Sequence, residues 1–230
     1  MSYVIPPPPQ PSLSVEGSDD RFPLHRIYCV GRNYAEHTRE MGGDPHRSPP
    51  FFFMKPADCI VEDGGSLPYP PATSDLHHEV ELVVALGKGG ANIPLAQALE
   101  HVYGYAVGID LTRRDLQADA KEKRQPWDAG KGFRHSAPCG ALRTVTAVGH
   151  PDAGAIELTV DGEVRQTGDL KQMIWTVPEV ISFLSGLFTL EAGDLIFTGT
   201  PAGVAAVGPG ARLEASVAGL APLSVTINAG

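Results

Sequence analysis

The sequence predicts an α+β domain in which strands outweigh helices. Its apolar segments are mostly short and end at or near a glycine or a proline. The chain contains 26 glycines and 21 prolines among 230 residues, yet they follow no repeat period. A few segments between the strands have helical spacing. These observations favour many short strands joined by turns, with helices in some connections.

The length suggests one domain with an N-terminal appendage. We expect an extended proline-rich arm over residues 1–22, where a run of prolines precedes small polar residues. Such an arm can fold back on the body or onto a neighbouring subunit. The remainder, residues 23–230, is expected to form a single domain.

Apolar runs that end at turn residues predict the strands. The clearest hairpin is centred on Asp161-Gly162, a dipeptide typical of tight turns. Another turn signal, GKGG, follows the apolar run that contains Glu79 and Glu81. The expected strands and hairpins lie within residues 25–34, 51–61, 78–87, 103–112, 156–166, 193–204 and 212–227.

Four segments have helical spacing. The first begins at Asn33, a suitable N-cap, and stops at Gly42-Gly43. The glycines that flank Lys131, by contrast, disfavour a helix around that residue. The expected helices lie within residues 33–43, 94–102, 113–125 and 176–190.

The formal charge is −9, from 18 basic and 27 acidic residues. This balance argues against nucleic acid as a partner, and an anionic substrate would need a local positive centre. The scattered cysteines Cys29, Cys59 and Cys139 are typical of free thiols in a reducing compartment. Because no apolar run has membrane-spanning length and no signal pattern opens the chain, we expect a cytoplasmic protein without a membrane partner.

Two glutamates in an apolar strand point to a metal. Glu79 and Glu81 are two positions apart, so they share one face of the strand and repel one another unless water or a cation lies between them. Asp110 ends the next apolar strand. Three carboxylates that converge from two strands suit Mg²⁺ or Mn²⁺. His77 and His78 could instead form a zinc or iron site, but we expect them outside the ligand set.

Several motifs in a fixed order resemble the fumarylacetoacetate hydrolase family. They are HHEVELVV, YGYAVGIDLTRRDLQ, PWDAGKGF and LEAGDLIFTGTPAGV, and the resemblance extends from about residue 25 to the C-terminus. It implies a mixed β-sandwich roll with a short lid helix, usually assembled as a homodimer. It also implies that Mg²⁺ or Mn²⁺ is held by Glu79, Glu81 and Asp110.

His37 and Glu40 are three residues apart, so a helix would place them on one face. Spacing alone favours an ordinary surface pair. The resemblance favours a catalytic role, because family members that cleave carbon–carbon bonds often carry H-x-x-E on a lid helix. A carboxylate beside an imidazole fixes its tautomer and prepares it to deprotonate water.

The resemblance also implies roles for other polar residues. Lys131 and Gln117 would donate hydrogen bonds to a developing oxyanion. Arg114 would meet a substrate carboxylate or support the metal ligands. Lys55, which follows a very apolar strand, and Thr200, in a glycine-rich turn, are further candidates for substrate binding.

We therefore expect a metal-dependent hydrolase of an acylpyruvate, most simply fumarylpyruvate, which would yield fumarate and pyruvate in aromatic catabolism. The substrate would be a small anionic keto acid. Three alternatives remain open: oxaloacetate decarboxylation or keto–enol tautomerisation, isomerisation of a dicarboxylic hydroxydienoate, and a non-catalytic β-roll that binds small acids.

Overall fold

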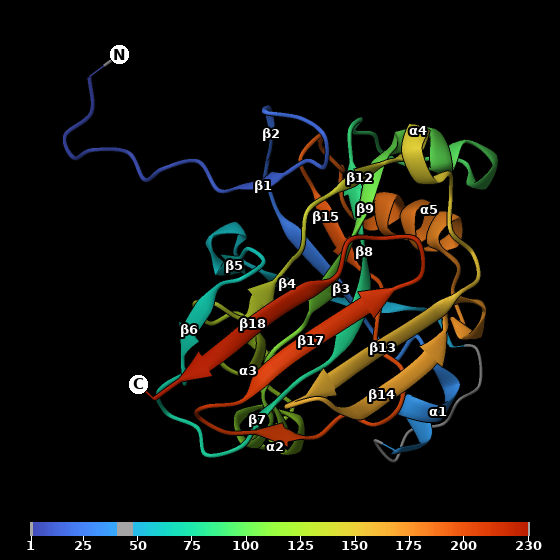
Figure 1. Ribbon diagram of the computed structural model, residues 1–230. Coiled ribbons are helices and arrows are strands. Elements are labelled where there is room, and N and C mark those ends of the chain that lie inside the picture. Colours follow the sequence, from blue (N-terminus) through green and yellow to red (C-terminus); the bar gives the residue numbers. More distant parts are fainter. Residues whose placement is uncertain (1, 41–47, 230) are drawn as a thin grey trace.

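Two β-sheets packed face to face form the body of the protein (Figure 1). The computed structural model describes residues 2–40 and 48–229. The first sheet has six strands in the order β12-β9-β8-β15-β3-β4, and the second has five in the order β14-β13-β17-β18-β6. Both sheets are mixed, because β15 pairs parallel with β3 and β18 parallel with β6. The expected mixed β-sandwich roll is confirmed.

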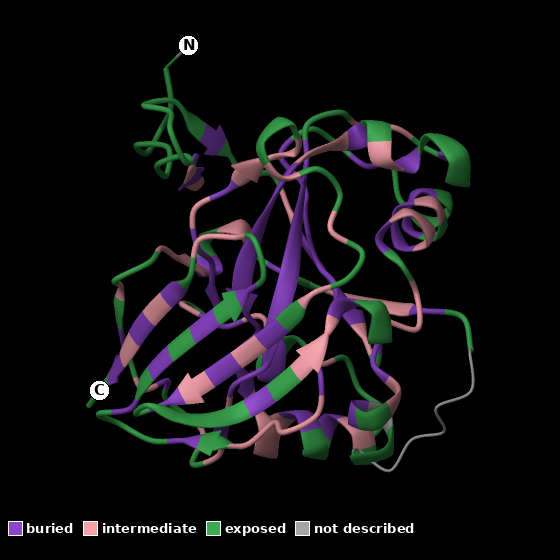
Figure 2. Cartoon of the chain, turned by 45° about the vertical axis from the view of Figure 1, so that its right-hand side comes forward, coloured by how far each residue is buried: buried purple, intermediate pink, exposed green. Residues whose placement is uncertain are grey.

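The six-stranded sheet lies in the centre of the molecule, and its middle strands are buried along their length (Figure 2). Burial on both faces explains why these strands are continuous apolar runs rather than alternating ones. Its strands are β3 (Ile27–Gly31), β4 (Phe51–Lys55), β8 (Val80–Leu86), β9 (Val102–Ile109), β12 (Arg143–Thr144) and β15 (Leu195–Phe197).

The five-stranded sheet covers one face of the first sheet. Buried and exposed residues alternate along β17, as expected for a sheet with one solvated face. The hairpin predicted at Asp161-Gly162 is confirmed, since both residues have positive φ between two paired strands. Its strands are β6 (Ser66–Pro68), β13 (Ala155–Val160), β14 (Glu163–Asp169), β17 (Arg212–Val217) and β18 (Leu223–Asn228).

Short strands and helices connect and flank the two sheets. The short strands are β1 (Ser12–Ser14), β2 (Arg21–Pro23), β5 (Ile60–Val61), β7 (Leu76–His77), β10 (Thr112–Arg113), β11 (Ala137–Pro138) and β16 (Ala206–Val207). The α-helices are α1 (Ala35–Glu40), α2 (Arg114–Glu122), α3 (Asp128–Lys131), α4 (Val145–Val148) and α5 (Val177–Leu187). The 3₁₀ helices are η1 (Ala57–Cys59), η2 (Leu95–His101) and η3 (Leu170–Gln172).

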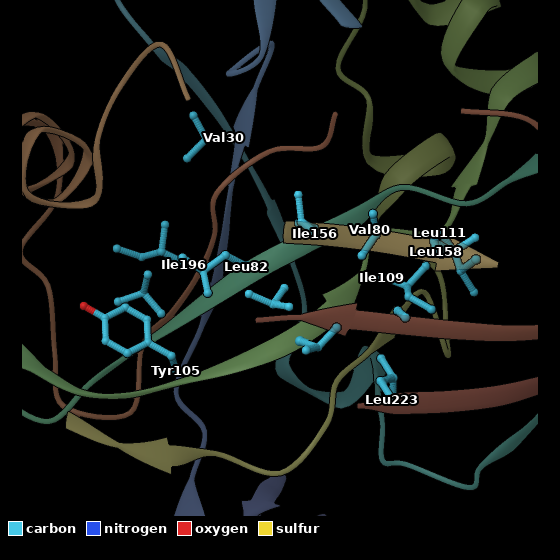
Figure 3. Packing of buried hydrophobic residues seen from close by; sticks show 14 of the residues in the cluster. Val30, Val80, Leu82, Tyr105, Ile109, Leu111, Ile156, Leu158, Ile196 and Leu223 are labelled. Carbon is cyan, nitrogen blue, oxygen red and sulfur yellow. The ribbon is translucent and has the colours of Figure 1, made fainter. Parts of the chain in front are cut away.

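Apolar side chains from both sheets form the main core. Figure 3 shows Val80, Leu82 and Ile109 of the six-stranded sheet beside Ile156 and Leu158 of the other sheet. Since side chains alternate along β8, its neighbouring residues Glu81, Val83 and Ala85 face the opposite way. A second, smaller core covers that face, and it includes Val83, Ala85, Cys29 and Phe197.

The N-terminal segment contributes to the second core. Residues 12–14 and 21–23 form the β1–β2 hairpin, and Leu13, Val15 and Phe22 are buried in that core. The residues before this hairpin run away from the body (Figure 1). The boundary expected at residue 22 therefore stays a prediction.

The helix expected within residues 94–102 is present as a 3₁₀ helix over residues 95–101. Two local expectations differ from the structure. A one-turn helix, α3, forms at Lys131 despite its flanking glycines, because Gly132 N–H donates to Asp128 carbonyl oxygen at 2.7 Å. Asn33, the expected N-cap, directs its side chain to residues distant in sequence. Its amide NH₂ donates to the Trp175 and Thr198 carbonyl oxygens at 2.9 and 2.8 Å, and its Oδ1 accepts from the Trp175 N–H at 2.7 Å. The stop predicted at Gly42-Gly43 lies outside the described residues.

Within residues 2–40 and 48–229, every helix is too short or too polar to cross a membrane.

Two glycines offer a test of the packing. A Cβ on Gly108 would lie 2.5 Å from Val83 and 2.6 Å from Phe197, whereas a Cβ on Gly186 of α5 would meet nothing within 4 Å. We expect Gly108→Ala to lower the free energy of unfolding by about 1–3 kcal/mol through overpacking. Gly186→Ala should raise it by about 0.5–1 kcal/mol, because alanine loses less backbone entropy in a helix. Urea denaturation measures both, and equal effects of the same sign would contradict the packing described.

Candidate metal centre and active site

The three carboxylates predicted to bind a metal lie together on one face of the six-stranded sheet. Glu81 of β8 pairs with Gly108 of β9, and Glu79 directly precedes β8. Asp110 directly follows β9, and its N–H donates to Glu79 carbonyl oxygen at 2.8 Å. One ligand oxygen of each carboxylate lies within 4.8 Å of the others, and all three side chains are buried. Strand alternation and register together bring the three residues to one point.

The Lys131 ammonium bridges two of these carboxylates. Its Nζ donates to Glu79 Oε2 at 2.9 Å, to Asp110 Oδ2 at 2.7 Å and to Thr112 Oγ1 at 2.6 Å. These three bonds use every donor of an ammonium group. Lys131 therefore lies where it was expected, although it contacts the predicted metal ligands directly.

Arg114 links the same cluster to helix α2. Its guanidinium donates to Glu79 Oε1 at 2.5 Å and to Gln117 Oε1 at 2.7 Å. Its backbone N–H donates to Asp75 carbonyl oxygen at 2.8 Å, which fixes the start of the helix. Gln117 Oε1 accepts the hydrogen bond from Arg114, so the amide NH₂ of Gln117 can donate hydrogen bonds to other groups.

Glu79 and Glu81 have opposite electrostatic surroundings. Burial raises the pKa of Glu79, but the charges of Lys131 and Arg114 outweigh burial and hold that pKa below its ordinary value. Burial raises the pKa of Glu81 well above its ordinary value, and the charges of Asp110 and Glu79 raise it further. Of these two glutamates, Glu81 therefore gains more from a nearby cation.

A glycine-rich loop after β15 supports Glu81. Gly199 has a φ of +96°, and its N–H donates to Glu81 Oε2 at 2.7 Å. A Cβ on Gly199 would lie 2.7 Å from the Cβ of Asn33, so a side chain does not fit there. The next residue, Thr200, is buried and lines the cavity described below, where its Oγ1 accepts from Gln166 at 2.7 Å.

Lys55 lies behind the carboxylates, away from the cavity. Its Nζ is 2.8 Å from Asp110 Oδ1 and donates to Leu111 carbonyl oxygen at 3.1 Å and to the Lys131 carbonyl oxygen. Its side chain is fully buried and does not belong to the cavity lining. These contacts support Asp110, and the predicted contact of Lys55 with substrate stays untested.

His37 and Glu40, the residues predicted to belong to a lid helix, lie on α1 beside the cluster. His37 is buried and lines the cavity, with its Nδ1 3.5 Å from Glu40 Oε2, too far for a strong hydrogen bond. Burial lowers the pKa of His37, and the charge of Glu79 only partly offsets this effect. Glu40 accepts the Gly203 N–H at 3.0 Å, which fastens the lid helix to the loop after β15.

A cavity joins these residues and exposes two further cations. It is lined by His37, Glu79, Glu81, Arg114, Gln117, Lys131 and Thr200, and also by Arg32, Lys121, Phe51, Phe53 and Trp127. Lys121 Nζ lies 5.0 Å from the Trp127 ring centre, and Arg32 Cζ lies 5.7 Å from that of Phe51. Burial, with the charges of Arg114 and Arg32, lowers the pKa of Lys121 to about 8.

Sequence reasoning did not identify Arg32 and Lys121. Lys121 carried a usable signal, because Arg114, Gln117 and Lys121 have the i, i+3, i+7 spacing of one helix face. The sequence contained no such signal for Arg32. Its side chain points toward the cavity because the backbone has a positive φ of 59° directly after β3.

The donor set fits Mg²⁺ or Mn²⁺. Three buried carboxylates offer only oxygen atoms, which hard divalent cations prefer. Neither neighbouring histidine belongs to this cluster among the described residues. His78 Nδ1 lies 2.9 Å from Gln166 Oε1, and His77 Nε2 lies 2.8 Å from Asp75 Oδ1.

Comparison with known proteins agrees with this site. The family described as "Fumarylacetoacetate (FAA) hydrolase C-terminal" matches residues 26–228. The chain belongs to the fumarylacetoacetate hydrolase family.

Relatives within the fumarylacetoacetate hydrolase family have more than one named activity. Fumarylpyruvate hydrolase of a Ralstonia species is 44% identical over 177 residues, which cover 77% of this chain and 92% of the relative. The mitochondrial oxaloacetate tautomerase of Rattus norvegicus is 43% identical over 194 residues, covering 84% and 87%. The crystal structure of Pseudomonas aeruginosa fumarylpyruvate hydrolase in complex with Mn²⁺ and pyruvate is 53% identical, with a TM-score of 0.97 and 100% of both chains covered.

The raised pKa of Glu81 gives a prediction for metal binding in this family member. A cation requires the ionised carboxylate, so Mn²⁺ affinity should rise with pH as Glu81 loses its proton. At a pH below this raised pKa, binding should release protons, which titration calorimetry in buffers of different ionisation enthalpy measures. Glu81→Gln should weaken binding by about 100-fold or more, since even outer partners of ligands are worth about 10–100-fold.

Asp119→Asn is the matched control, because Asp119 is half-exposed on α2 and paired with Lys123. Its Mn²⁺ affinity should equal that of the unaltered protein. An affinity that does not change between about pH 5 and about pH 8 would contradict the proton coupling.

Proposed function

We propose that this protein hydrolyses the carbon–carbon bond of an acylpyruvate, with fumarylpyruvate as the substrate and fumarate and pyruvate as the products. The observation that carries this proposal is a cluster of three buried carboxylates, two of which, Glu79 and Glu81, line one cavity together with His37 of helix α1. The relatives named fumarylpyruvate hydrolase, at 44% and 53% identity, support it.

Glu79, Glu81 and Asp110 would hold the metal. When bound, Mg²⁺ or Mn²⁺ supplies Lewis acidity and positive charge for the 2-oxo acid end of the substrate. The bound cation would supply the local positive charge that an anionic substrate requires in a chain of formal charge −9. Arg114 and Lys55 hold the carboxylates from outside, through Glu79 and Asp110.

His37 would act as the general base. Burial lowers its pKa, so the imidazole is neutral near pH 7 and can accept a proton from water. Glu40 would be a positioning residue: its bond to Gly203 N–H keeps α1 over the cavity, and its carboxylate lies on the Nδ1 side of the imidazole.

The reaction balances without a further reactant. Water deprotonated by His37 adds to the keto carbon of the acyl group, which becomes a tetrahedral oxyanion. Gln117 would donate its amide N–H to this oxyanion, and Lys131 would do so by exchanging one of its three present acceptors. The carbon–carbon bond then breaks, its electron pair leaves with the pyruvate enolate, and the proton held by His37 returns to that fragment.

The acyl end of fumarylpyruvate carries a second carboxylate. Arg32 and Lys121 supply positive charge to the same cavity, beside the rings of Phe51 and Trp127. We infer that Lys121, with Arg32, binds this distal carboxylate. Thr200, which also lines the cavity, would offer a hydroxyl to the 2-oxo acid end.

A second candidate is oxaloacetate tautomerisation, favoured by the 43% identity to the rat mitochondrial enzyme. The same acidic cluster and Lewis-acid chemistry would serve an oxaloacetate enol. This activity needs no attack by water on a ketone, so it does not require His37 as a hydrolytic base.

We further propose that the protein acts in the cytoplasm, as a homodimer, in the breakdown of aromatic compounds. Its bacterial fumarylpyruvate hydrolase relatives support the pathway, and its buried free cysteines suit a reducing compartment.

His37→Ala tests the hydrolytic assignment. Loss of the general base should lower kcat for fumarylpyruvate by about 10²–10⁴-fold. The loss of diketone absorbance and the release of pyruvate measure hydrolysis, and oxaloacetate tautomerisation is followed in parallel. Glu36→Ala, an exposed position on the same helix, is the control and should leave both rates unchanged.

If His37→Ala keeps full hydrolytic activity, the lid histidine is not the base. If the unaltered protein tautomerises oxaloacetate but releases no pyruvate from any acylpyruvate, the second candidate replaces the first.

Lys121→Met tests the binding of the distal carboxylate. Its kcat/KM for fumarylpyruvate should fall by about 10–100-fold, while kcat/KM for acetylpyruvate, which has no charge at that end, should change less than about twofold. Lys123→Met is the matched control, since Lys123 follows the same helix and pairs with exposed Asp119. An equal fall in kcat/KM for both substrates would mean that Lys121 maintains the structure of the site and does not bind the distal carboxylate.

A further inference from the structure

Most of the exposed large apolar side chains of the described residues gather in two places. Among the described residues, Tyr3, Val4 and Ile5 of the N-terminal arm are 66%, 103% and 73% exposed. A second group lies on β4 and at the end of α5, and it comprises Met54, Phe183, Leu187 and Phe188. Apolar patches of this kind mark interaction sites on folded proteins.

The second group borders a groove rich in aromatic rings. This aromatic groove is lined by Phe51, Phe52, Phe53, Met54, Trp127 and Phe188, and its volume is about 470 Å³. The rings support one another: Phe51 meets Trp127 edge to face at 5.2 Å, and Phe52 lies 6.2 Å from Phe183. The groove follows β4, the last strand of the six-stranded sheet. It is therefore a firm surface beside a sheet edge.

The arm has a fixed root and a stiff middle. Gln10 donates through Nε2 to Leu24 carbonyl oxygen at 2.6 Å, and Leu24 N–H donates to Pro11 carbonyl oxygen at 2.8 Å. Beyond this root, the prolines at residues 6–9 restrict the backbone to an extended polyproline conformation. Figure 1 shows the arm running away from its own body, and none of the described residues of the arm lines the groove of its own chain.

The chemistry of the arm matches that of the groove. Proline-rich extended segments bind aromatic-lined grooves, because their conformation is preformed and little entropy is lost. No residue before Glu16 carries a charged side chain, so no side-chain charge of the arm loses its hydration on docking. Tyr3, Val4 and Ile5 add apolar area at the free end of the arm.

We propose that residues 2–9 of one copy of this chain bind in the aromatic groove of a second copy, and that each copy both gives and receives an arm. Such an exchange is symmetric, as expected for a two-fold dimer. The inference rests on the homodimer of the proposed function and adds the surface that holds the dimer together.

The docked arm would lie against a wall of the catalytic cavity. Phe51, Phe53, Trp127 and Lys131 line both the aromatic groove and the cavity. The partner's arm thus covers the outer side of rings whose inner side faces the substrate.

Cross-linking between copies tests the contact directly. The native cysteines are buried, so a thiol-specific reagent reports on introduced ones. Chains with Val4→Cys and chains with Met54→Cys are expressed together and treated with a short bismaleimide. We expect a covalent dimer from the pair and none from either variant alone. Val4→Cys paired with Val164→Cys, an exposed position on β14, is the matched control and should stay unlinked.

Deletion of residues 2–9 tests what the contact contributes. The deletion ends before the anchored root, so the β1–β2 hairpin and its core contacts remain. We expect the dimer dissociation constant from sedimentation equilibrium to rise by about tenfold or more. Met54→Asp should act in the same direction, and Leu95→Asp, an exposed apolar position elsewhere, should have no effect.

Three results would overturn the inference. In the first, the double variant Val4→Cys/Met54→Cys is mixed with an excess of unaltered protein and still forms a cross-link within one chain. This result would mean that the arm binds the groove of its own chain. In the second, the Val4→Cys and Met54→Cys chains do not cross-link, and deletion of residues 2–9 leaves the dimer dissociation constant unchanged. The third is a full-length chain that is monomeric, in which case the proposed homodimer fails as well. Fumarylpyruvate hydrolysis is assayed on the same samples, so a failure of the arm contact is separable from a failure of the catalytic proposal.

Discussion

Three carboxylates buried within 4.8 Å of one another repel strongly, and much of the structure around β8 and β9 offsets that repulsion. Lys131 joins Glu79 to Asp110, Arg114 approaches Glu79 from α2, and Lys55 reaches Asp110 from the edge strand β4. Glu81 instead receives a backbone N–H from Gly199. The cations are therefore distributed unevenly, and the carboxylate least compensated by them is the one whose pKa is raised.

This charge arrangement also organises the surrounding elements. Lys131 can reach the carboxylates because α3 packs against β4 and β10. The Lys55 ammonium stabilises this packing by donating a hydrogen bond to the Lys131 carbonyl oxygen. On the other side, the loop that presents Gly199 is tied to the start of the lid through Asn33, which donates to Thr198 carbonyl oxygen. Hydrogen bonds thus link Glu79 and Asp110 to Lys131 and, through Arg114, link Glu79 to Gln117. A second set links Glu81 to the loop after β15 and that loop to Asn33, just before α1.

The aromatic residues between the cavity and the surface would have two roles. Phe51 and Phe53 leave β4 on the side of the carboxylates, and Trp127 closes the gap to α2. Their rings exclude water from one side of a highly charged site, which strengthens the electrostatic interactions inside it. The same rings form an apolar surface on the outside, beside the free edge of the sheet. A single aromatic wall can therefore serve catalysis on one side and association on the other.

The sequence by itself determined the features that follow from local rules. Strand alternation placed Glu79 and Glu81 on one face, the end of an apolar run marked Asp110, and the Asp161-Gly162 turn gave a hairpin. Only the tertiary structure decided which distant groups meet them. Lys131 reaches the carboxylates from a one-turn helix, although its flanking glycines disfavour a helix. The Asn33 side chain bonds to residues distant in sequence, and Arg32 lines the cavity because its backbone has a positive φ. The physical reason is that periodicity acts over a few residues, whereas buried charges and polar groups choose partners by proximity in space, and register and packing set that proximity.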